Sequence, residues 1–126
     1  MRVVDTSVWI EWLLDTPLGT SLKPQLPQLD QWIVPTVVQL ELAKWLGREK
    51  GEPVANKTIA LTQICVVIPL ESPIAMAAAE VCRKHGLSTA DAIIYATAQQ
   101  YEADLLTCDA HFEGLPGVVY VPKKPH

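Results

Sequence analysis

Short apolar segments alternate with helical segments along the chain, and this alternation limits the fold more than any other feature of the sequence. Runs of branched apolar residues bounded by polar, Gly or Pro residues predict five strands, at residues 3–4, 32–34, 65–68, 104–107 and 118–121. Parallel strands need a long crossover between them, which the intervening helical segments can supply. The pattern therefore predicts an α/β fold with a parallel sheet and helices on both faces.

Periodic apolar residues predict the helices between these strands. The expected helices cover residues 6–14, 36–51, 54–63, 72–86 and 88–101, and a weaker one at 18–29 is interrupted by Pro24 and Pro27. Thr36, Ser72 and Ser88 stand where N-caps are expected, immediately before or at the start of an apolar periodic segment.

Size and composition indicate one globular domain. The 126 residues form a single expected domain, residues 1–126, and 49% of them are hydrophobic, so a core can form. No apolar run approaches the roughly 20 residues that span a bilayer, and the chain enters its first strand without a signal-peptide pattern. The widely spaced Cys65, Cys82 and Cys108 favour free thiols over a disulfide framework or a zinc site. We therefore expect a cytoplasmic protein that does not associate with membranes.

Carboxylates follow two of the predicted strands. Asp5 comes directly after the first strand and is followed by Thr6 and Ser7, while Asp109 comes shortly after Thr107 at the end of the fourth strand. In open α/β sheets, ligands bind beyond the carboxyl ends of the strands. Asp5 and Asp109 are therefore candidate site residues, although each could instead cap the short helix that follows it.

Glu41 interrupts the apolar face of the helix predicted at residues 36–51. Val38, Glu41, Leu42 and Trp45 recur at the spacing of a core-facing stripe. A lone buried carboxylate costs several kcal/mol or becomes protonated. Either Glu41 belongs to a buried polar site, or it lies at the edge of the stripe and pairs with Lys44, for about 0.2–0.5 kcal/mol.

Asp91 lies in the first turn of a segment of small apolar residues, which is typical of a buried helix. With Ser88 it resembles a capping box, and its charge suits the helix dipole. Capping alone does not explain why four acids occupy places that could face one crevice, if the first and fourth strands are neighbours. Like charges about 4 Å apart repel by roughly 1–4 kcal/mol, and oxygen ligands favour Mg²⁺ or Mn²⁺ over zinc.

Four segments of the chain resemble the signature segments of the PIN-domain family, and specifically its VapC-type toxin ribonucleases. They are VVDTSVWIEWL, VVQLELAKWL, LSTADAIIYATA and LLTCDAHF, and they occur in the family's order over nearly the whole chain. The resemblance implies a PIN-like three-layer α/β sandwich whose five-stranded parallel sheet has the order 3-2-1-4-5. The first and fourth strands would then lie side by side.

The resemblance also implies a site and a function. It places the catalytic and metal-binding carboxylates at Asp5, Glu41, Asp91 and Asp109. Ser7 and Thr107 match the family's hydroxyl positions, and with Thr6 they would support the carboxylates through hydrogen bonds. Cys108 departs from the family, where a polar or basic residue is frequent, so the local substrate contacts stay open. The implied activity is endoribonucleolytic hydrolysis of RNA phosphodiester bonds by a water that Mg²⁺ or Mn²⁺ activates.

Partners follow partly from the resemblance, which implies an RNA substrate, a cognate antitoxin and a homodimer. The formal net charge of −4 opposes RNA binding unless cations occupy the acidic site. Lys44 and Arg48 are the expected substrate-binding residues, along the helix that carries Glu41; the alternative is a solvated helix end. Trp9 and Trp12 share a helix face with Leu13, which is either core or interface.

Other functions fit the residues less well. A PIN-like module that binds metal or RNA without toxin activity remains an alternative. A receiver-like phospho-switch would need an aspartate after the third strand, where Pro69 and Leu70 stand, and an Asp-based phosphohydrolase would need a second aspartate in the segment DTSVW. His85 is expected to interact with a helix dipole, and His111 has no matching Ser or Cys nucleophile.

Overall fold

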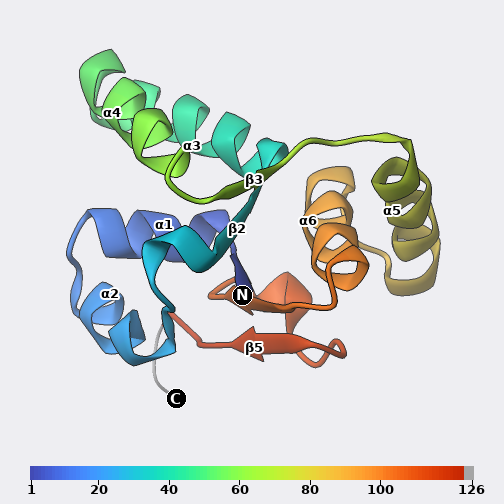
Figure 1. Ribbon diagram of the computed structural model, residues 1–126. Helices are drawn as coiled ribbons and strands as arrows, with labels where there is room; N and C mark the ends of the chain where they lie inside the picture. The colour runs from blue at the N-terminus through green and yellow to red at the C-terminus, as the bar shows by residue number, and fades with distance from the viewer. Residues whose placement is uncertain (124–126) are drawn as a thin grey trace.

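Five parallel strands form the centre of the computed structural model, which describes residues 1–123 (Figure 1). The strands are β1 (Arg2–Val4), β2 (Trp32–Pro35), β3 (Val66–Ile68), β4 (Asp104–Thr107) and β5 (Val118–Tyr120). Their order is β3-β2-β1-β4-β5, and each neighbouring pair is parallel. The predicted fold class and strand order are therefore confirmed, and β1 lies between β2 and β4.

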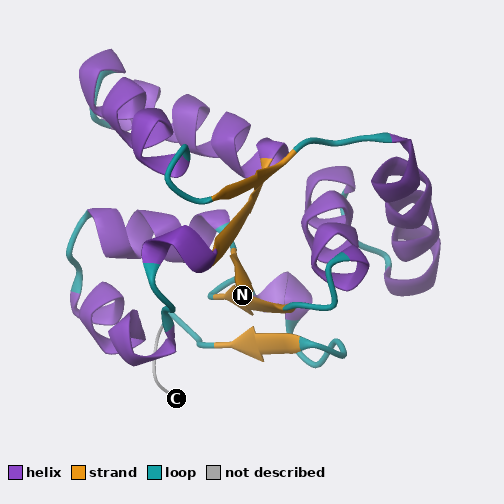
Figure 2. Cartoon of the chain, viewed as in Figure 1, coloured by secondary structure: helices purple, strands orange, loops and turns teal. Residues whose placement is uncertain are grey.

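Helices enclose this sheet from two sides. They are α1 (Thr6–Leu13), α2 (Pro17–Leu22), α3 (Thr36–Glu49), α4 (Glu52–Thr62), α5 (Ser72–His85) and α6 (Thr89–Gln100). Figure 1 shows α1 and α2 to the left of the strands, α5 and α6 to the right, and the α3–α4 hairpin above them. The strands occupy the middle layer in Figure 2. Within residues 1–123, none of the helices combines the length and the apolar character needed to cross a membrane.

Several predicted boundaries shift in the structure. The weak helix expected at residues 18–29 is divided into α2 and two 3₁₀ turns, η1 (Lys23–Gln25) and η2 (Leu29–Gln31), because proline removes a backbone donor and fixes its own φ. Ser88 caps α6 as predicted. Thr36 and Ser72 do not act as caps, because each is the first residue of its helix: the N-cap positions are Pro35, at the end of β2, and Glu71.

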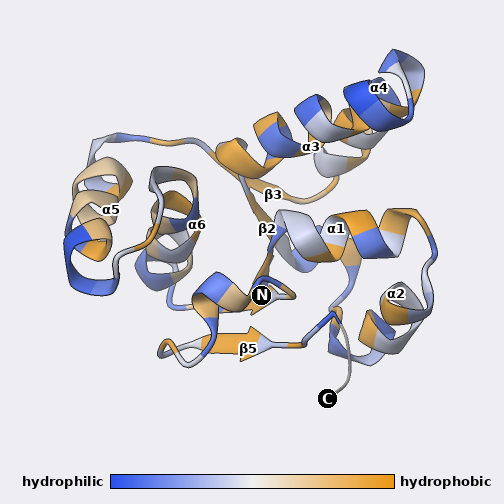
Figure 3. Ribbon diagram, turned by 180° about the vertical axis from the view of Figure 1, so that it is seen from behind, coloured by the Kyte–Doolittle hydropathy of each residue, from blue (hydrophilic) through white to orange (hydrophobic). Residues whose placement is uncertain are grey.

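Helix α6 has more buried residues than any other helix among residues 1–123. Six of its residues are buried, namely Ala92, Ile94, Tyr95, Ala96, Thr97 and Ala98. Its alanines let the helix lie close to both α5 and the sheet, and the Tyr95 hydroxyl is satisfied by the carbonyl of Pro116 at 2.6 Å. Figure 3 shows the apolar colouring of β2 and β5 and the mixed colouring of the surrounding helices. The small residues of α6 thus fix how closely Asp91, in its first turn, approaches the strands.

A group of three tryptophans fills the opposite side of the sheet. The Trp9 and Trp32 rings lie 4.8 Å apart, Trp12 contacts both, and Trp9 is fully buried. The helix face that carries Trp9 is therefore core rather than interface. Cys65, Cys82 and Cys108 are free thiols, as expected from their spacing.

Gly19 allows α2 to pack directly against α1, the helix that starts at the strand end bearing Asp5. A Cβ atom placed on Gly19 would lie 2.2 Å from the carbonyl oxygen of Glu11, which is a backbone atom and cannot rotate away. The two helices therefore approach more closely than any side chain at this position would permit. By contrast, a Cβ on Gly47 of α3 would meet nothing within 4 Å.

We predict that Gly19→Ala destabilises the protein by about 1–3 kcal/mol, since α2 must move away from α1. Gly47→Ala is the matched control, and it should stabilise the protein by about 0.5–1 kcal/mol because alanine is the better helix former. Urea unfolding of the two variants and the wild type measures both effects. Equal stability of Gly19→Ala and the wild type would show that the helices separate at no cost.

Candidate metal centre

The register of β1 and β4 places Asp5 beside Thr107 at the carboxyl edge of the sheet. Val4 pairs with Leu106, and the Asp5 amide donates to the Leu106 carbonyl at 3.0 Å. The hydroxyls of Ser7 and Thr107 both donate to Asp5 Oδ2, each at 2.8 Å. Asp5 is only 4% exposed. The carboxylate is therefore held in one orientation by residues from two neighbouring strand ends.

The second oxygen of Asp5 is left for another partner. Both hydroxyls bind Oδ2, and no donor among residues 1–123 reaches Oδ1. Asp5 occupies the N-cap position of α1 but makes no capping hydrogen bond, so the capping alternative is wrong for this residue. Burial raises the pKa of Asp5 to about 6; the bonds from Thr107 and Ser7 oppose the rise, and the charges of Glu41 and Asp109 add to it. A cation at Oδ1 would remove this cost.

Glu41 reaches the same edge from α3. It is half-buried, and Thr6 donates to its Oε1 at 2.7 Å. Lys44 is exposed, and no ion pair joins it to Glu41 among the residues that the structure describes. The alternative of a surface pair between Glu41 and Lys44 is therefore wrong. The glutamate is instead held by the residue that follows Asp5.

Asp91 and Asp109 lie beside each other, and the charge of Asp109 also acts on Asp5. The Asp91 amide donates to Ser88 Oγ at 3.3 Å, so the capping interaction predicted for this turn is present. Burial raises the pKa of the Asp91 carboxyl, and the charge of Asp109 raises it further, while contacts with Ser88 and His111 lower it. The two acids thus lie close enough to repel each other.

Hydrogen bonds through the backbone fix the loop that carries Asp109. The Asp109 amide donates to Thr107 Oγ1 at 2.9 Å, and the Cys108 amide donates to Ser7 Oγ at 3.0 Å. The Asp109 carboxylate accepts from the His111 amide at 2.9 Å and so caps the 3₁₀ turn η3 (Ala110–Phe112). The capping alternative is therefore correct for Asp109, in addition to its place beside Asp91. The Cys108 side chain is buried, and its backbone amide is the group that bonds Ser7.

His111 is a member of this group that sequence reasoning missed. Its Nδ1 lies 3.2 Å from Asp109 Oδ1 and 3.5 Å from Asp91 Oδ2. The only sequence signal was its spacing, two residues after Asp109 in a segment already assigned to the site. Lys44 and Arg48 are not brought to the carboxylates: both are exposed, and the guanidinium of Arg48 lies 3.7 Å from Glu49.

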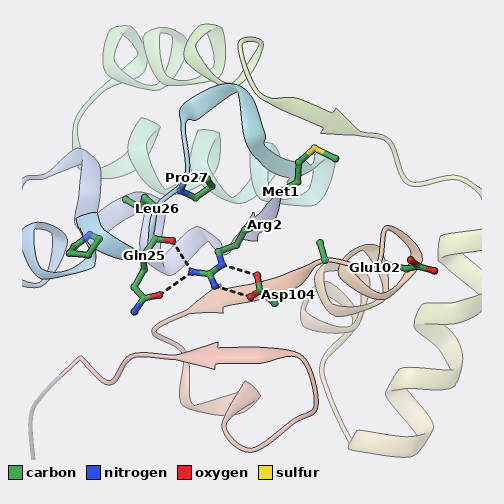
Figure 4. Close-up of a pocket in the computed structure, with 9 residues that line it drawn as sticks. Met1, Arg2, Gln25, Leu26, Pro27, Glu102 and Asp104 are labelled. Carbon is green, nitrogen blue, oxygen red and sulfur yellow. Dashed lines mark hydrogen bonds and ion pairs between the residues drawn. The ribbon is translucent and has the colours of Figure 1, made fainter.

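A separate hollow lies at the opposite end of β1 and β4. It has a volume of about 680 Å³, and Figure 4 shows Arg2 at its centre. Arg2 donates from Nε and Nη2 to the two oxygens of Asp104, at 2.7 and 2.8 Å, and from Nη1 to the Gln25 carbonyl at 2.7 Å. These bonds direct the guanidinium to protein acceptors and tie η1 to the sheet. We therefore interpret the hollow as structural.

The donor set at the carboxyl edge fits a hard divalent cation. It has two parts: Asp5 and Glu41, whose carboxylates are oriented by hydroxyls, and Asp91 and Asp109, which together with His111 have ligand atoms within 4.8 Å of one another. Asp5 Oδ1 has no donor among the described residues, and Asp91 and Asp109 repel each other without a counter-ion. These features are costs to the metal-free fold that a bound Mg²⁺ or Mn²⁺ would offset.

The raised pKa of Asp5 predicts a specific pH dependence of the metal-free protein. Below about pH 4, Asp5 is protonated in both the folded and the unfolded protein, so it does not change the free energy of unfolding. As the pH rises from there through about 6, the unfolded protein ionises Asp5 more readily than the folded protein does, and the free energy of unfolding falls. Asp5→Asn does not titrate, so its stability relative to wild type should rise by up to about 3 kcal/mol between pH 4 and pH 7. Asp30→Asn, at an exposed position, is the control and should show no such trend. Urea unfolding of chelator-treated protein across this range is the measurement, and parallel pH profiles for Asp5→Asn and wild type would contradict the assigned cost of ionising Asp5.

Known proteins share this architecture. A chain of a toxin–antitoxin complex from Klebsiella pneumoniae is 23% identical, with 94% of this chain and 96% of that chain covered and a TM-score of 0.81. VapC20 from Mycobacterium tuberculosis, described as a sarcin–ricin loop cleaving toxin, is 20% identical over 97% and 99% of the two chains, with a TM-score of 0.77. FitAcB from Neisseria gonorrhoeae is 22% identical over 97% and 98%, with a TM-score of 0.75.

These solved structures share the fold at low identity, and the comparison with curated proteins gave no match. The sequence model of the PIN domain matches residues 2–118, which include β1 to β4, the first residue of β5 and every carboxylate of the site. This match extends over nearly the whole chain, and the strand order agrees with it. The chain therefore belongs to the PIN domain family.

Proposed function

We propose that this protein is a metal-dependent endoribonuclease and the toxin component of a toxin–antitoxin pair. The observation that carries the proposal is the arrangement of Asp5: a buried carboxylate, held by two hydroxyls at one oxygen and open at the other, beside the charges of Glu41 and Asp109. Membership of the PIN domain family supports the nuclease chemistry. The toxin–antitoxin complexes among the similar structures support the biological role.

Each acid has a distinct proposed role. Asp5 is the central ligand, since it directly follows β1, the middle strand of the sheet, and its orientation is fixed. Asp91 and Asp109 complete the ligand set from the side of α6 and η3, and Glu41 orients a water or a second ion from α3. When Mg²⁺ or Mn²⁺ is bound, it supplies an activated water and stabilises negative charge on the attacked phosphate.

The hydroxyl residues hold the carboxylates in place. Thr6 binds Glu41, while Ser7 and Thr107 bind Asp5, and Thr107 also accepts from the Asp109 amide. Thr107 therefore links two of the four acids through one oxygen. Supporting residues of this kind affect metal affinity and activity through the orientation of the ligands.

RNA is proposed to approach along α3. Lys44 and Arg48 lie one and two turns beyond Glu41 on this helix, and both side chains are exposed. The acidic centre repels the RNA backbone, so positive charge beside it would contribute much of the binding free energy. We further propose that a cognate antitoxin silences the protein, because several similar structures are toxin–antitoxin complexes. The homodimer and the cytoplasmic location expected from the sequence belong to the same proposal.

The nuclease proposal predicts that Asp5→Asn and Glu41→Gln each reduce RNA cleavage by at least about 100-fold, because direct ligands matter more than the outer groups whose loss costs 10–100-fold. EDTA should abolish cleavage, and Mg²⁺ or Mn²⁺ should restore it. The measurement is sequencing of new 5′-phosphate ends in cellular RNA incubated with purified protein, with Asp30→Asn as the control. Cleavage that persists in EDTA would refute the metal mechanism, and RNA binding without cleavage would favour a binding module.

The proposed RNA path predicts that Lys44→Glu combined with Arg48→Glu weakens RNA binding. It should also flatten the slope of log K against log salt by roughly 1–2, since two phosphate contacts are lost. Lys23→Glu combined with Lys57→Glu changes the net charge equally, at exposed positions on η1 and α4, and should alter binding less. Fluorescence anisotropy at several salt concentrations gives both slopes. Identical slopes for the two double variants would place the RNA elsewhere.

A further inference from the structure

The side chain of His111 faces the metal centre although most of it is in solvent. The imidazole is 76% exposed, yet Nδ1 lies 3.2 Å from Asp109 Oδ1 and 3.5 Å from Asp91 Oδ2. One ligand atom from each of Asp91, Asp109 and His111 lies within 4.8 Å of the other two. Three potential donors from α6 and η3 thus surround a single point.

The spacing of these atoms is that of ligands around one ion. Neighbouring ligands of an octahedral ion with bonds of about 2.1 Å lie roughly 3 Å apart, which is close to the observed separations of 3.2 and 3.5 Å. A charge-assisted hydrogen bond would be shorter, at about 2.7–2.9 Å. Both distances are also within ion-pair range, so the imidazole nitrogen stands where it can either pair with the two carboxylates or share an ion with them.

Local structure fixes His111 in this place. Its own amide donates to Asp109 Oδ1 at 2.9 Å, so the turn that orients the carboxylate also orients the histidine. The next residue, Phe112, is fully buried and anchors η3 to the core. On its outer side the imidazole lines a hollow of about 450 Å³, together with His85, Ser88 and Asp91, which leaves room for the water ligands of an ion.

We propose that His111 Nδ1 is a third ligand, with Asp91 and Asp109, of a divalent cation, and that it makes this site prefer Mn²⁺ over Mg²⁺. The inference rests on the metal site of the proposed function and adds a nitrogen ligand to its carboxylates. Mg²⁺ takes oxygen ligands almost exclusively, whereas first-row transition ions also accept imidazole. A site with two carboxylates and one imidazole therefore favours Mn²⁺ over Mg²⁺ more strongly than a site made of carboxylates alone.

A second explanation of the position of His111 predicts the opposite change in metal affinity when the residue is removed. If His111 only neutralises the two carboxylates, it competes with the cation, and its removal should leave metal affinity unchanged or raise it. If His111 is a ligand, its removal should lower the affinity for Mn²⁺ much more than the affinity for Mg²⁺. The sign of the change separates the two explanations.

The test is calorimetric titration of the full chain with Mn²⁺ and with Mg²⁺, at pH 8, because a coordinating imidazole must be neutral. His111→Ala should bind Mn²⁺ at least about tenfold more weakly and change Mg²⁺ affinity by less than about threefold. His85→Ala, which removes the other imidazole of the same hollow, is the matched control and should keep both affinities. Electron spin-echo spectra of bound Mn²⁺ should show coupling to nitrogen in wild type and His85→Ala, and lose it in His111→Ala.

The outcomes separate this inference from the function on which it rests. Metal binding that His111→Ala leaves unchanged or strengthens would overturn the His111 assignment alone. Failure of the wild type to bind either ion would overturn the metal site together with the assignment. Because the side chain is largely exposed, His111→Ala is expected to fold, and its urea unfolding midpoint in EDTA verifies this.

Discussion

The hydrogen bonds between the segments that follow β1 and β4 are the constraint on which the site depends. Thr107 donates to Asp5 and accepts from Asp109, while Ser7 donates to Asp5 and accepts from Cys108. Each hydroxyl therefore serves one segment as donor and the other as acceptor. This reciprocity requires β1 and β4 to be adjacent and in the observed register, so the fold and the site depend on the same contacts.

The arrangement places unfavourable charge where function requires it. Burial removes the Asp5 carboxylate from water and raises its pKa. Burial and the neighbouring charge of Asp109 raise the pKa of Asp91. A protein of this size has a stability of only about 5–15 kcal/mol, so such costs must be supported elsewhere. The support comes from the apolar strands, from the small-residue face of α6 and from the tryptophan group, which are buried in the core.

Much of the fold could be predicted from the sequence, because it is encoded in local patterns of apolar and polar residues. The alternation of apolar runs and helices is local, and it correctly gave parallel strands. The resemblance supplied the strand order, which local patterns cannot, since order depends on contacts between distant segments. It also supplied the four acids together as a set. The detail that failed was decided by a tertiary contact: Thr36 is not a cap, because a strand runs straight into its helix. A tertiary contact also decided between the two alternatives for Glu41, which is bound by Thr6, far away in sequence, and not by Lys44.

His111 shows a different limit. Its helix propensity and hydropathy are those of an ordinary surface residue, and its spacing from Asp109 does not indicate the direction of its exposed side chain. Its position follows from the turn η3, which the Asp109 carboxylate caps and Phe112 anchors. The residue could be recognised only after two acids from distant segments had been placed beside it.

The clamp between Arg2 and Asp104 has a consequence for the time scale on which the site persists. It closes the amino end of the β1–β4 pair, just as the hydroxyl bonds of Asp5 close the carboxyl end. A strand pair fastened at both ends and buried along its length cannot fray from either side, so its amides exchange with solvent only when the whole domain opens. The backbone on which Asp5 stands is therefore held from both ends of the strand pair, and its carboxylate is already oriented by Ser7 and Thr107 before any ligand binds.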